Sequence, residues 1–270
     1  CNRDEDFTVK VYAENHKPFN YLSGNDIVGS SAELIQTVMN TNQEENGITL
    51  VSWNEGYAAL QEEDNAALIT IAMTEEKKQL FKWAGPIATI NASFFTEASS
   101  GIVVATIEQA KELESIGVPA GYSQQEQLTN QGFSNLTAFE TLEEMLTALL
   151  NGSVDAVVET KHALENALEE MGHTSGEIVE NMYFQTFLGY IAFNNGVPDE
   201  TVDAWQKSID QFKENGYFES LYNQYLPGEI PPGTFQIFTE SNPPQNYLND
   251  ENVPEGSAID IVNEISSRNN

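Results

Sequence analysis

The sequence predicts an α/β fold made of two lobes, and three observations carry that prediction. Predicted strands and helices alternate along the chain, which is the pattern of wound α/β domains. Some predicted strands are continuous apolar runs, as in Ala66–Ala72, and such runs are typical of strands covered on both faces. With 270 residues, the chain is long enough to form two such lobes.

The first lobe begins with a strand, a loop and an amphipathic helix. The strand is predicted at residues 7–12, and Pro18 breaks the extended run because proline has no N–H to donate. After Gly29, either Ser30 or Ser31 is expected to cap the helix. Its inward face is predicted from the 3.6-residue period to contain Leu34, Ile35, Val38 and Met39.

Further elements follow in the same alternation. Thr74 is expected to cap a short helix that Gly85–Pro86 ends, and residues 90–95 are expected to cross to the second lobe. The remaining predicted strands lie at residues 48–52, 66–72, 116–119, 136–139, 154–158 and 183–193. The remaining predicted helices lie at residues 53–61, 107–113, 141–150, 163–171, 201–215 and 218–225, and Ser123 is expected to cap another that follows it.

The opening stretch of the chain returns near its end. The plan of residues 7–39 is repeated by residues 235–265, and the equivalent residues appear in the same order. Glu14, Pro18, Asn20, Tyr21, Leu22 and Gly29 recur as Glu240, Pro244, Asn246, Tyr247, Leu248 and Gly256. Polar residues, prolines and glycines that match in order indicate an internal repeat rather than a shared apolar pattern.

Composition excludes some classes of partner. The chain has 11 Lys+Arg against 42 Asp+Glu, a net charge of −31. Such a field repels phosphate backbones and anionic membrane surfaces, so nucleic acid is not expected as a partner. No apolar run reaches the ~18 residues of a transmembrane helix. Three histidines and one terminal cysteine form no metal-ligand pattern, and no cofactor or metal is expected.

The single cysteine is residue 1. It excludes an internal disulfide, and the polar residues after it resemble the start of a processed bacterial lipoprotein. This resemblance implies a lipid on Cys1 and an extracytoplasmic location. The alternative is that Cys1 has no such role and is merely the first residue of this sequence.

Several short motifs resemble a known family when they are taken in order. They are the proline loop 17–21, Gly29 with Glu33, Trp53 before Leu60, residues 74–77 leading to Phe81-Lys82-Trp83-Ala84-Gly85-Pro86, Gly121-Tyr122-Ser123, Asp155-Ala156-Val157-Val158 and residues 222–227. Residues 7–226 resemble an extracellular solute-binding protein of the amino-acid-binding family of ABC importers. The resemblance implies a type II periplasmic-binding fold, with hinges near residues 87–92 and 191–194.

The resemblance also implies which residues face the ligand. It places there the first-strand loop, one aromatic of the next helix, a hydroxyl of the third strand and the start of a helix in the second lobe. These positions, with the two discussed next, are Glu14, His16, Phe19, Trp53, Thr70, Lys77, Tyr122, Ser123, Gln124 and Thr160.

Two positions depart from the family pattern. Members that bind free amino acids hold the carboxylate with arginine where this chain has Lys77, and the ammonium group with aspartate where it has Thr160. Lysine lacks the bidentate fork of arginine, and threonine cannot neutralise an ammonium group. A neutral or cationic small polar solute therefore fits Glu14 and Glu55 better than a standard amino acid. A cleft that has lost its ligand is the alternative.

The resulting domain prediction is lobe 1 at residues 1–88 and 193–228, lobe 2 at 89–192, a linker at 229–234 and the start of a second tandem copy at 235–270. The predicted function is to bind a solute and deliver it to an ABC permease. A ligand-sensing module of a membrane receptor or kinase is the alternative. An enzyme of dehydratase or lytic type on the same fold is disfavoured, because no spacing places a carboxylate pair.

Overall fold

The computed structural model describes residues 7–44, 46–233, 245, 247–249 and 254–261. The chain divides into two units, Cys1–Pro232 and Gly233–Asn270. Cys1 lies outside the described residues, so its lipid stays a prediction. No helix in the described ranges is both long enough and apolar enough to cross a membrane.

The first unit contains one sheet of eight strands in the order β4-β1-β5-β10-β6-β9-β7-β8. These strands are β1 (Lys10–Glu14), β4 (Ile48–Val51), β5 (Ala66–Ala72), β6 (Lys82–Glu97), β7 (Ile116–Pro119), β8 (Leu136–Phe139), β9 (Ala156–Thr160) and β10 (Ile178–Phe193). β2 (Tyr21–Ser23) and β3 (Asp26–Val28) form a separate hairpin. β1 is parallel to β4 and β5, and β7 is parallel to β8 and β9.

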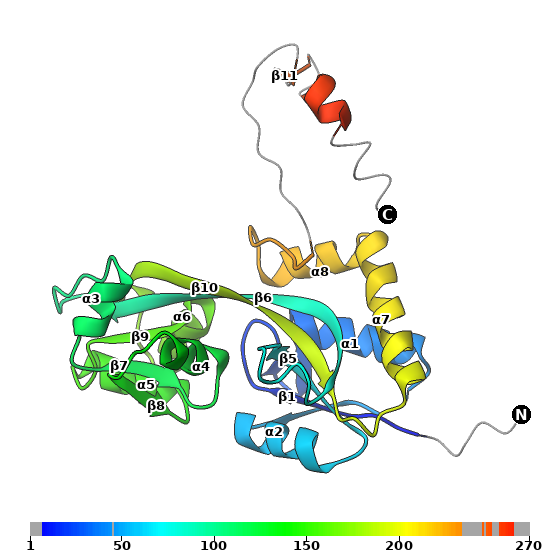
Figure 1. Cartoon of the computed structure of the whole chain (residues 1–270), viewed down its shortest axis with the longest axis horizontal. Coiled ribbons are helices and arrows are strands. Elements are labelled where there is room, and N and C mark those ends of the chain that lie inside the picture. Colours follow the sequence, from blue (N-terminus) through cyan, green and yellow to red (C-terminus); the bar gives the residue numbers. More distant parts are fainter. Residues whose placement is uncertain (1–6, 45, 234–244, 246, 250–253, 262–270) are drawn as a thin grey trace, which may run out of the picture. The chain divides into compact units, whose positions relative to one another are not determined.

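The antiparallel strands β6 and β10 join the two parallel groups, and Figure 1 shows them running side by side between two sets of helices. Lobe 1 holds α1 (Ser30–Thr41), α2 (Trp53–Glu62), α7 (Asp199–Glu214) and α8 (Tyr217–Tyr225). Lobe 2 holds α3 (Ile107–Glu112), α4 (Ser123–Asn130), α5 (Leu142–Leu150), α6 (Lys161–Glu170) and the 3-10 turn η1 (Ser175–Glu177). The predicted pair of α/β lobes is confirmed; the residue boundaries given for them stay predictions.

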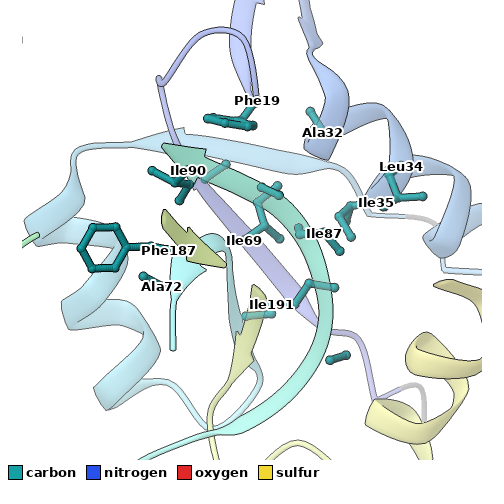
Figure 2. Close-up of a cluster of buried hydrophobic side chains, with 14 of the residues drawn as sticks. Phe19, Ala32, Leu34, Ile35, Ile69, Ala72, Ile87, Ile90, Phe187 and Ile191 are labelled. Atoms are coloured by element: carbon teal, nitrogen blue, oxygen red, sulfur yellow. The ribbon is translucent and has the colours of Figure 1, made fainter. Parts of the chain in front are cut away.

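The core of lobe 1 holds the site's first strand in place. The four residues predicted to face inward from α1 are buried, and Figure 2 shows Leu34 and Ile35 beside Ile87 of β6. Ile69 of β5 and Ile191 of β10 belong to the same cluster, as do Val11 and Ala13 of β1. Each such side chain contributes about 1.5–3 kcal/mol when fully buried, so the ends of β1 and β5 are fixed by packing.

The prediction of a short helix after Thr74 was wrong. Residues 75–80 form turns, and β6 starts at Lys82 and continues through Gly85 and Pro86. A helix of one or two turns gains few hydrogen bonds for its nucleation cost. The alternative is the pairing of β6 with β10, which includes Ala84 with Ile191 and forms a long series of backbone hydrogen bonds.

The predicted side-chain caps at Ser30, Ser31 and Ser123 were also wrong. Gly29 and Tyr122 are the N-cap residues, and neither cap uses a side-chain hydrogen bond. In α1 the free N–H groups of Ser30 and Ser31 donate to the carbonyl oxygens of Pro18 and Phe19, at 3.1 and 2.9 Å. Because the preceding loop supplies these acceptors, α1 needs no side-chain cap.

Three predicted strands are displaced along the chain. β1 begins at Lys10 rather than at residue 7, and β9 begins at Ala156 rather than at residue 154. β10 begins at Ile178 rather than at residue 183, and it pairs with β5 from Gly189 onward. In each case the partner strand decides which residues pair, and the apolar pattern alone does not define that register.

The described part of the second unit contains a hairpin and a helical segment. β11 (Tyr247–Leu248) pairs with β12 (Pro254–Glu255), and residues 257–261 are helical. Tyr247 lies opposite Glu255, just as its equivalent Tyr21 lies opposite Val28.

The glycine after this hairpin has the same conformation as its counterpart in the first unit. Gly256 has φ 122° and Gly29 has φ 120°, a region that favours glycine. The N–H of Ala258 donates to the carbonyl of Gln245, as that of Ser31 does to Phe19. Residues 234–244, which include Glu240, lie outside the described residues.

Candidate ligand-binding site

Side chains from both lobes meet where β1 ends. Glu14 is the last residue of β1, and Tyr122, the N-cap of α4 in lobe 2, donates its hydroxyl to the Glu14 carboxylate. Trp53, the first residue of α2, lies with its ring 5.1 Å from that of Tyr122. Lobe 1 therefore contributes a carboxylate and an indole, and lobe 2 contributes a phenol.

A cavity of about 30 Å³ remains between these groups, roughly the volume of one water molecule in the liquid. It is lined by eight of the ten residues that the sequence places at the site: Glu14, His16, Trp53, Thr70, Lys77, Tyr122, Ser123 and Gln124. A groove of about 700 Å³ also includes Glu14 and Trp53 and carries the acidic residues Glu55, Glu140, Glu143 and Glu170. The approach to Glu14 is thus strongly acidic.

Phe19 and Thr160 do not line this cavity. Phe19 is buried in the core of lobe 1. Its ring packs edge-to-face with that of His16, with 5.6 Å between the ring centroids, so it contacts a residue of the cavity without lining the cavity itself. Thr160 ends β9 and accepts the N–H of Ala163 at 3.3 Å as the N-cap of α6. Thr160 and Phe19 both line a different groove, to which β6 and β10 also contribute residues.

The carboxylate of Glu14 is largely shielded from water by the surrounding protein. Burial raises its pKa to about 7, and the hydroxyl of Tyr122 only partly opposes that shift. No ion pair among residues 7–44 and 46–233 involves Glu14. Its ionised form is therefore stabilised by a neutral donor alone, and a cation would gain by approaching it.

Glu159 is a second buried carboxylate, and the sequence reasoning missed it. It is fully buried, and it accepts from Gln124 Nε2 at 3.2 Å and from the N–H of Thr160 at 2.6 Å. Burial raises its pKa to about 7, and the nearby charge of Glu14 adds to the shift. The available signal was a glutamate at the end of the apolar run of β9. Burying a carboxylate costs free energy, so an acid in a buried strand indicates specific partners or a function.

His16 contributes a neutral imidazole. Burial lowers its pKa to about 4, because the charged form would lose its hydration. Its Nε2 atom is buried and has no hydrogen-bond partner within the described part of the chain. Buried polar atoms are normally paired, so this nitrogen is available to a bound molecule.

Thr70 and Asn20 fix the position of Glu14. Thr70 has φ 63°, unusual for a β-branched residue, and it sits where the β5–β10 register shifts. Its hydroxyl donates to Asn20 Oδ1 at 2.6 Å, and Asn20 Nδ2 donates to the Glu14 carbonyl. Strained backbone of this kind gathers at functional sites, and Asn20 was not among the predicted residues.

Lys77 forms an ion pair with a glutamate of the other lobe. Its Nζ lies 2.9 Å from Glu126 Oε2 of lobe 2, and the two side chains are only 10% and 15% exposed. A buried pair loses several kcal/mol when one partner is removed, so Lys77 is committed to Glu126. Groups of His, Cys, Asp and Glu that could hold a metal ion are absent from the described residues.

The buried acids give a pH prediction for the unliganded protein. A raised carboxyl pKa in the folded state contributes stability that is complete below the ordinary value of 4.5 and is lost as the pH rises through about 7. His16 contributes in the opposite sense, with stability lost as the pH falls from 6.5 through about 4. We therefore expect the free energy of unfolding of Glu14→Gln, minus that of the wild type, to increase as the pH rises from about 5 to about 7. Urea unfolding at several pH values measures this difference. An unchanged difference across that range would contradict the burial of Glu14 as an acid.

Two α/β lobes on paired strands, with polar groups from both lobes around a central cavity, define the class of two-lobed binding proteins. The family model for bacterial extracellular solute-binding proteins, family 3, matches residues 9–228. The chain belongs to that family.

Individual relatives are similar to this chain over most of their length and most of its own. A probable histidine-binding protein of Campylobacter jejuni is 25% identical over 228 residues, covering 81% of this chain and 84% of its own. The arginine-binding extracellular protein ArtP of Bacillus subtilis is 22% identical over 223 residues, covering 80% and 84%. A histidine kinase sensor domain with similarity to periplasmic binding proteins has a TM-score of 0.76 at 18% identity, covering 85% of this chain and 100% of that one, which shows the shared fold.

Proposed function

We propose that this protein binds a small organic cation between its two lobes and delivers it to an ABC importer. The observation that carries the proposal is the Glu14 carboxylate at the end of β1, which borders the central cavity without a basic partner in the described ranges. His16, Trp53 and Tyr122 surround the same cavity with a neutral nitrogen and two aromatic rings. Aromatic faces beside a carboxylate favour a cationic group.

The state of Lys77 supports a cation over an anion. Family members that bind free amino acids use an arginine at this position for the carboxylate, and here the lysine is paired with Glu126. Holding a ligand carboxylate would compete with that pair. The relatives named for histidine and arginine binding fit a basic solute. We therefore expect acidic amino acids not to bind.

The cavity has room for about one water, so binding a solute requires the lobes to part and close again over it. β6 and β10 are the strands about which they would move. This motion belongs to the hinge-closing class, in which contacts in the cleft shift the population of the closed form. Tyr122, which now donates to Glu14, is the contact that an entering cation would displace.

A thermal-shift panel tests this function. L-arginine, L-histidine, agmatine, putrescine, glycine betaine, a dipeptide and L-glutamate would be added to the purified chain at about pH 8, where Glu14 is ionised. A cation at 100 times its Kd is expected to add about 2.7 kcal/mol, which corresponds to roughly 5–10 °C for a protein of this size. Stabilisation by L-glutamate alone, or by no solute, would contradict the proposal.

Delivery to an importer is favoured over sensing because the family is one of extracellular solute-binding proteins. Its members bind solutes rather than transform them, and the proposal contains no catalytic step. A receptor role remains the second candidate, because a kinase sensor domain has the same fold. Genes encoding a permease and an ATPase beside this one would favour import, and a transmembrane signalling segment would favour sensing.

The repeat supports a second, related domain. Residues 235–265 match residues 7–39 in sequence, and the hairpin and glycine of the second unit match the first in register and φ. We propose that this segment is the strand-loop-helix start of a second solute-binding copy. The lipid on Cys1 belongs to the same extracytoplasmic proposal, and mass spectrometry of the protein from membranes would test it.

A further inference from the structure

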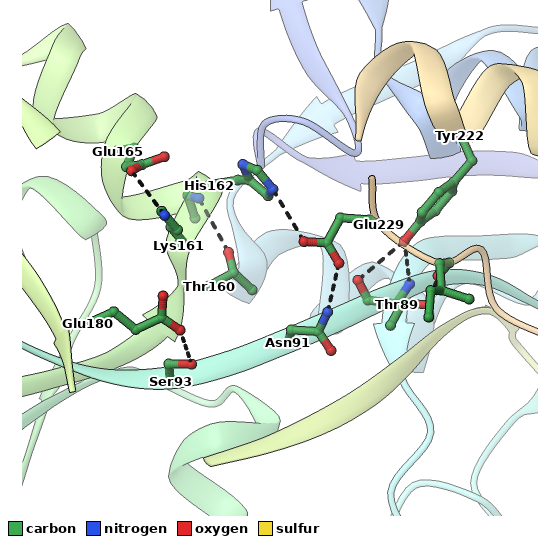
Figure 3. Close-up of polar contacts among 12 residues, drawn as sticks. Thr89, Asn91, Ser93, Thr160, Lys161, His162, Glu165, Glu180, Tyr222 and Glu229 are labelled. Carbon is green, nitrogen blue, oxygen red and sulfur yellow. Dashed lines mark hydrogen bonds and ion pairs between the residues drawn. The ribbon is translucent and has the colours of Figure 1, made fainter. Parts of the chain in front are cut away.

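The first unit ends in a short segment, residues 227–232, that we call the connector. The Oγ1 atom of Thr89 in β6 donates to the carbonyl of Ile230 at 3.1 Å, and the two prolines at 231 and 232 are buried. Tyr222 of α8 accepts the N–H of Thr89 at 3.1 Å, which fixes the same part of β6 (Figure 3). The connector is therefore packed against a strand that joins the lobes, rather than being a free tether.

One side chain of the connector contacts both the hinge and lobe 2. In Figure 3, Glu229 lies between Asn91 of β6 and His162, near the start of α6. One carboxylate oxygen accepts from Asn91 Nδ2 at 3.0 Å, and the other lies 3.7 Å from His162 Nε2. His162 belongs to the lobe that must move, whereas Glu229 follows the last helix of lobe 1.

The contact extends to the second crossing strand. Asn91 Oδ1 accepts from the hydroxyl of Thr186 in β10 at 2.6 Å, and Thr186 is 2.8 Å from the Tyr183 hydroxyl. Glu229 is thus tied through Asn91 to both strands that join the lobes. Rotation of lobe 2 about these strands would change the geometry around Glu229.

The surroundings leave space for that change. A groove of about 620 Å³ lies beside the connector, and it is lined by Asn91, His162, Glu165, Glu180 and Glu229. The other acids in it are held within one lobe or on one strand pair: Glu165 lies 4.0 Å from Lys161 in the same helix, and Glu180 accepts from Ser93 at 2.8 Å. Only the His162–Glu229 pair spans from the connector to lobe 2 in the lining of this groove.

We propose that the connector responds to lobe closure: Glu229 binds His162 in the closed form, so closure is registered where the chain leaves the first unit. Reciprocity follows, because a contact made only in the closed form also favours that form. The inference rests on the proposed opening and closing of the lobes, and it does not depend on the identity of the solute. It assigns Glu229 a positioning role outside the ligand cavity.

A covalent bridge across the cleft tests the proposal without a ligand. Asn54 of lobe 1 donates to Glu140 of lobe 2 at 2.7 Å, and both side chains are exposed. With Cys1→Ser, Asn54→Cys and Glu140→Cys, a short bis-maleimide adds to both thiols and locks the closed form, and a monomaleimide gives the unlocked reference. Hydrogen exchange is then carried out on the whole chain in both forms. The exchange of the amides of Glu229 and Ile230 is read by mass spectrometry of the peptides that contain them.

We expect the bridge to slow exchange at these two amides about fivefold, the size suited to one exposed side-chain contact with His162 and one charge-assisted hydrogen bond. Glu229→Ala should reduce the ratio to about one. Glu165→Ala removes the same charge from the same groove and should leave the ratio unchanged. The connector proposal is overturned if bridging changes nothing or if both variants behave alike.

Two other outcomes separate the proposals. Failure of the two thiols to bridge would contradict the lobe contact itself, and with it the response of the connector. A fivefold effect in a protein that no solute in the thermal panel stabilises would leave the connector standing and count against the proposed ligand class.

Discussion

Glu14→Gln is expected to weaken binding of L-arginine or agmatine by about 100-fold or more. Removing one partner of a buried charge pair costs about 3–5 kcal/mol, and each 1.4 kcal/mol is a factor of ten in Kd. Glutamine keeps the shape of the side chain and an oxygen that accepts from Tyr122, so the lobe contact survives. Isothermal titration at about pH 8 measures the loss.

The matched control is Glu143→Gln. Glu143 is exposed at the start of α5 and lines the large acidic groove, so it has the same charge without the burial. Its loss should change Kd by less than about threefold, since exposed charges are screened. Equal losses in both variants would mean that the acidic groove attracts the cation non-specifically and that Glu14 is not its binding group.

Gly29→Ala is expected to destabilise the protein by about 3 kcal/mol or more, because losses of this size arise from steric clashes and backbone strain. A Cβ atom on Gly29 would lie 2.4 Å from the carbonyl oxygen of Phe19 and 2.8 Å from that of Pro18, and φ is 120°. These are backbone atoms that cannot rotate away, and they accept the first N–H groups of α1. The loop that carries His16 and Asn20 would have to move.

Gly47→Ala is the control for that substitution. A Cβ atom on Gly47 would meet no other atom within 4 Å, and the φ of this glycine is not positive. Alanine there should therefore change stability by less than about 1 kcal/mol. Thermal unfolding should show a drop of roughly 6 °C or more for Gly29→Ala at about 2–4 °C per kcal/mol. Similar melting temperatures for the two variants would contradict the close approach at Gly29.

Much of the fold could be predicted from local pattern. The apolar run of β5 gave its bounds to the residue, and the helical period gave the buried face of α1, because both depend on neighbours in sequence. β6 was different: its path through Gly85 and Pro86 depends on pairing with β10, about a hundred positions later in the chain. No local propensity contains that information.

The site divides in the same way. Eight cavity residues followed from the family resemblance, which rests on short motifs read in order along the chain. The pairing of Lys77 with Glu126 did not, because it forms only between lobes. At the end of β9 the family position pointed to Thr160, yet the buried acid near the cavity is its neighbour Glu159. Successive strand residues face opposite ways, so an offset of one residue moves the charge to the other face.

A crystal structure of the chain grown with L-arginine at about pH 8 tests the central claim most directly. We predict density in the cleft with the guanidinium or ammonium group within hydrogen-bond distance of the Glu14 carboxylate, and with the Tyr122 hydroxyl displaced from it. The claim is contradicted if the ligand carboxylate lies on Lys77, with the Lys77–Glu126 pair broken and Glu14 still bound to Tyr122.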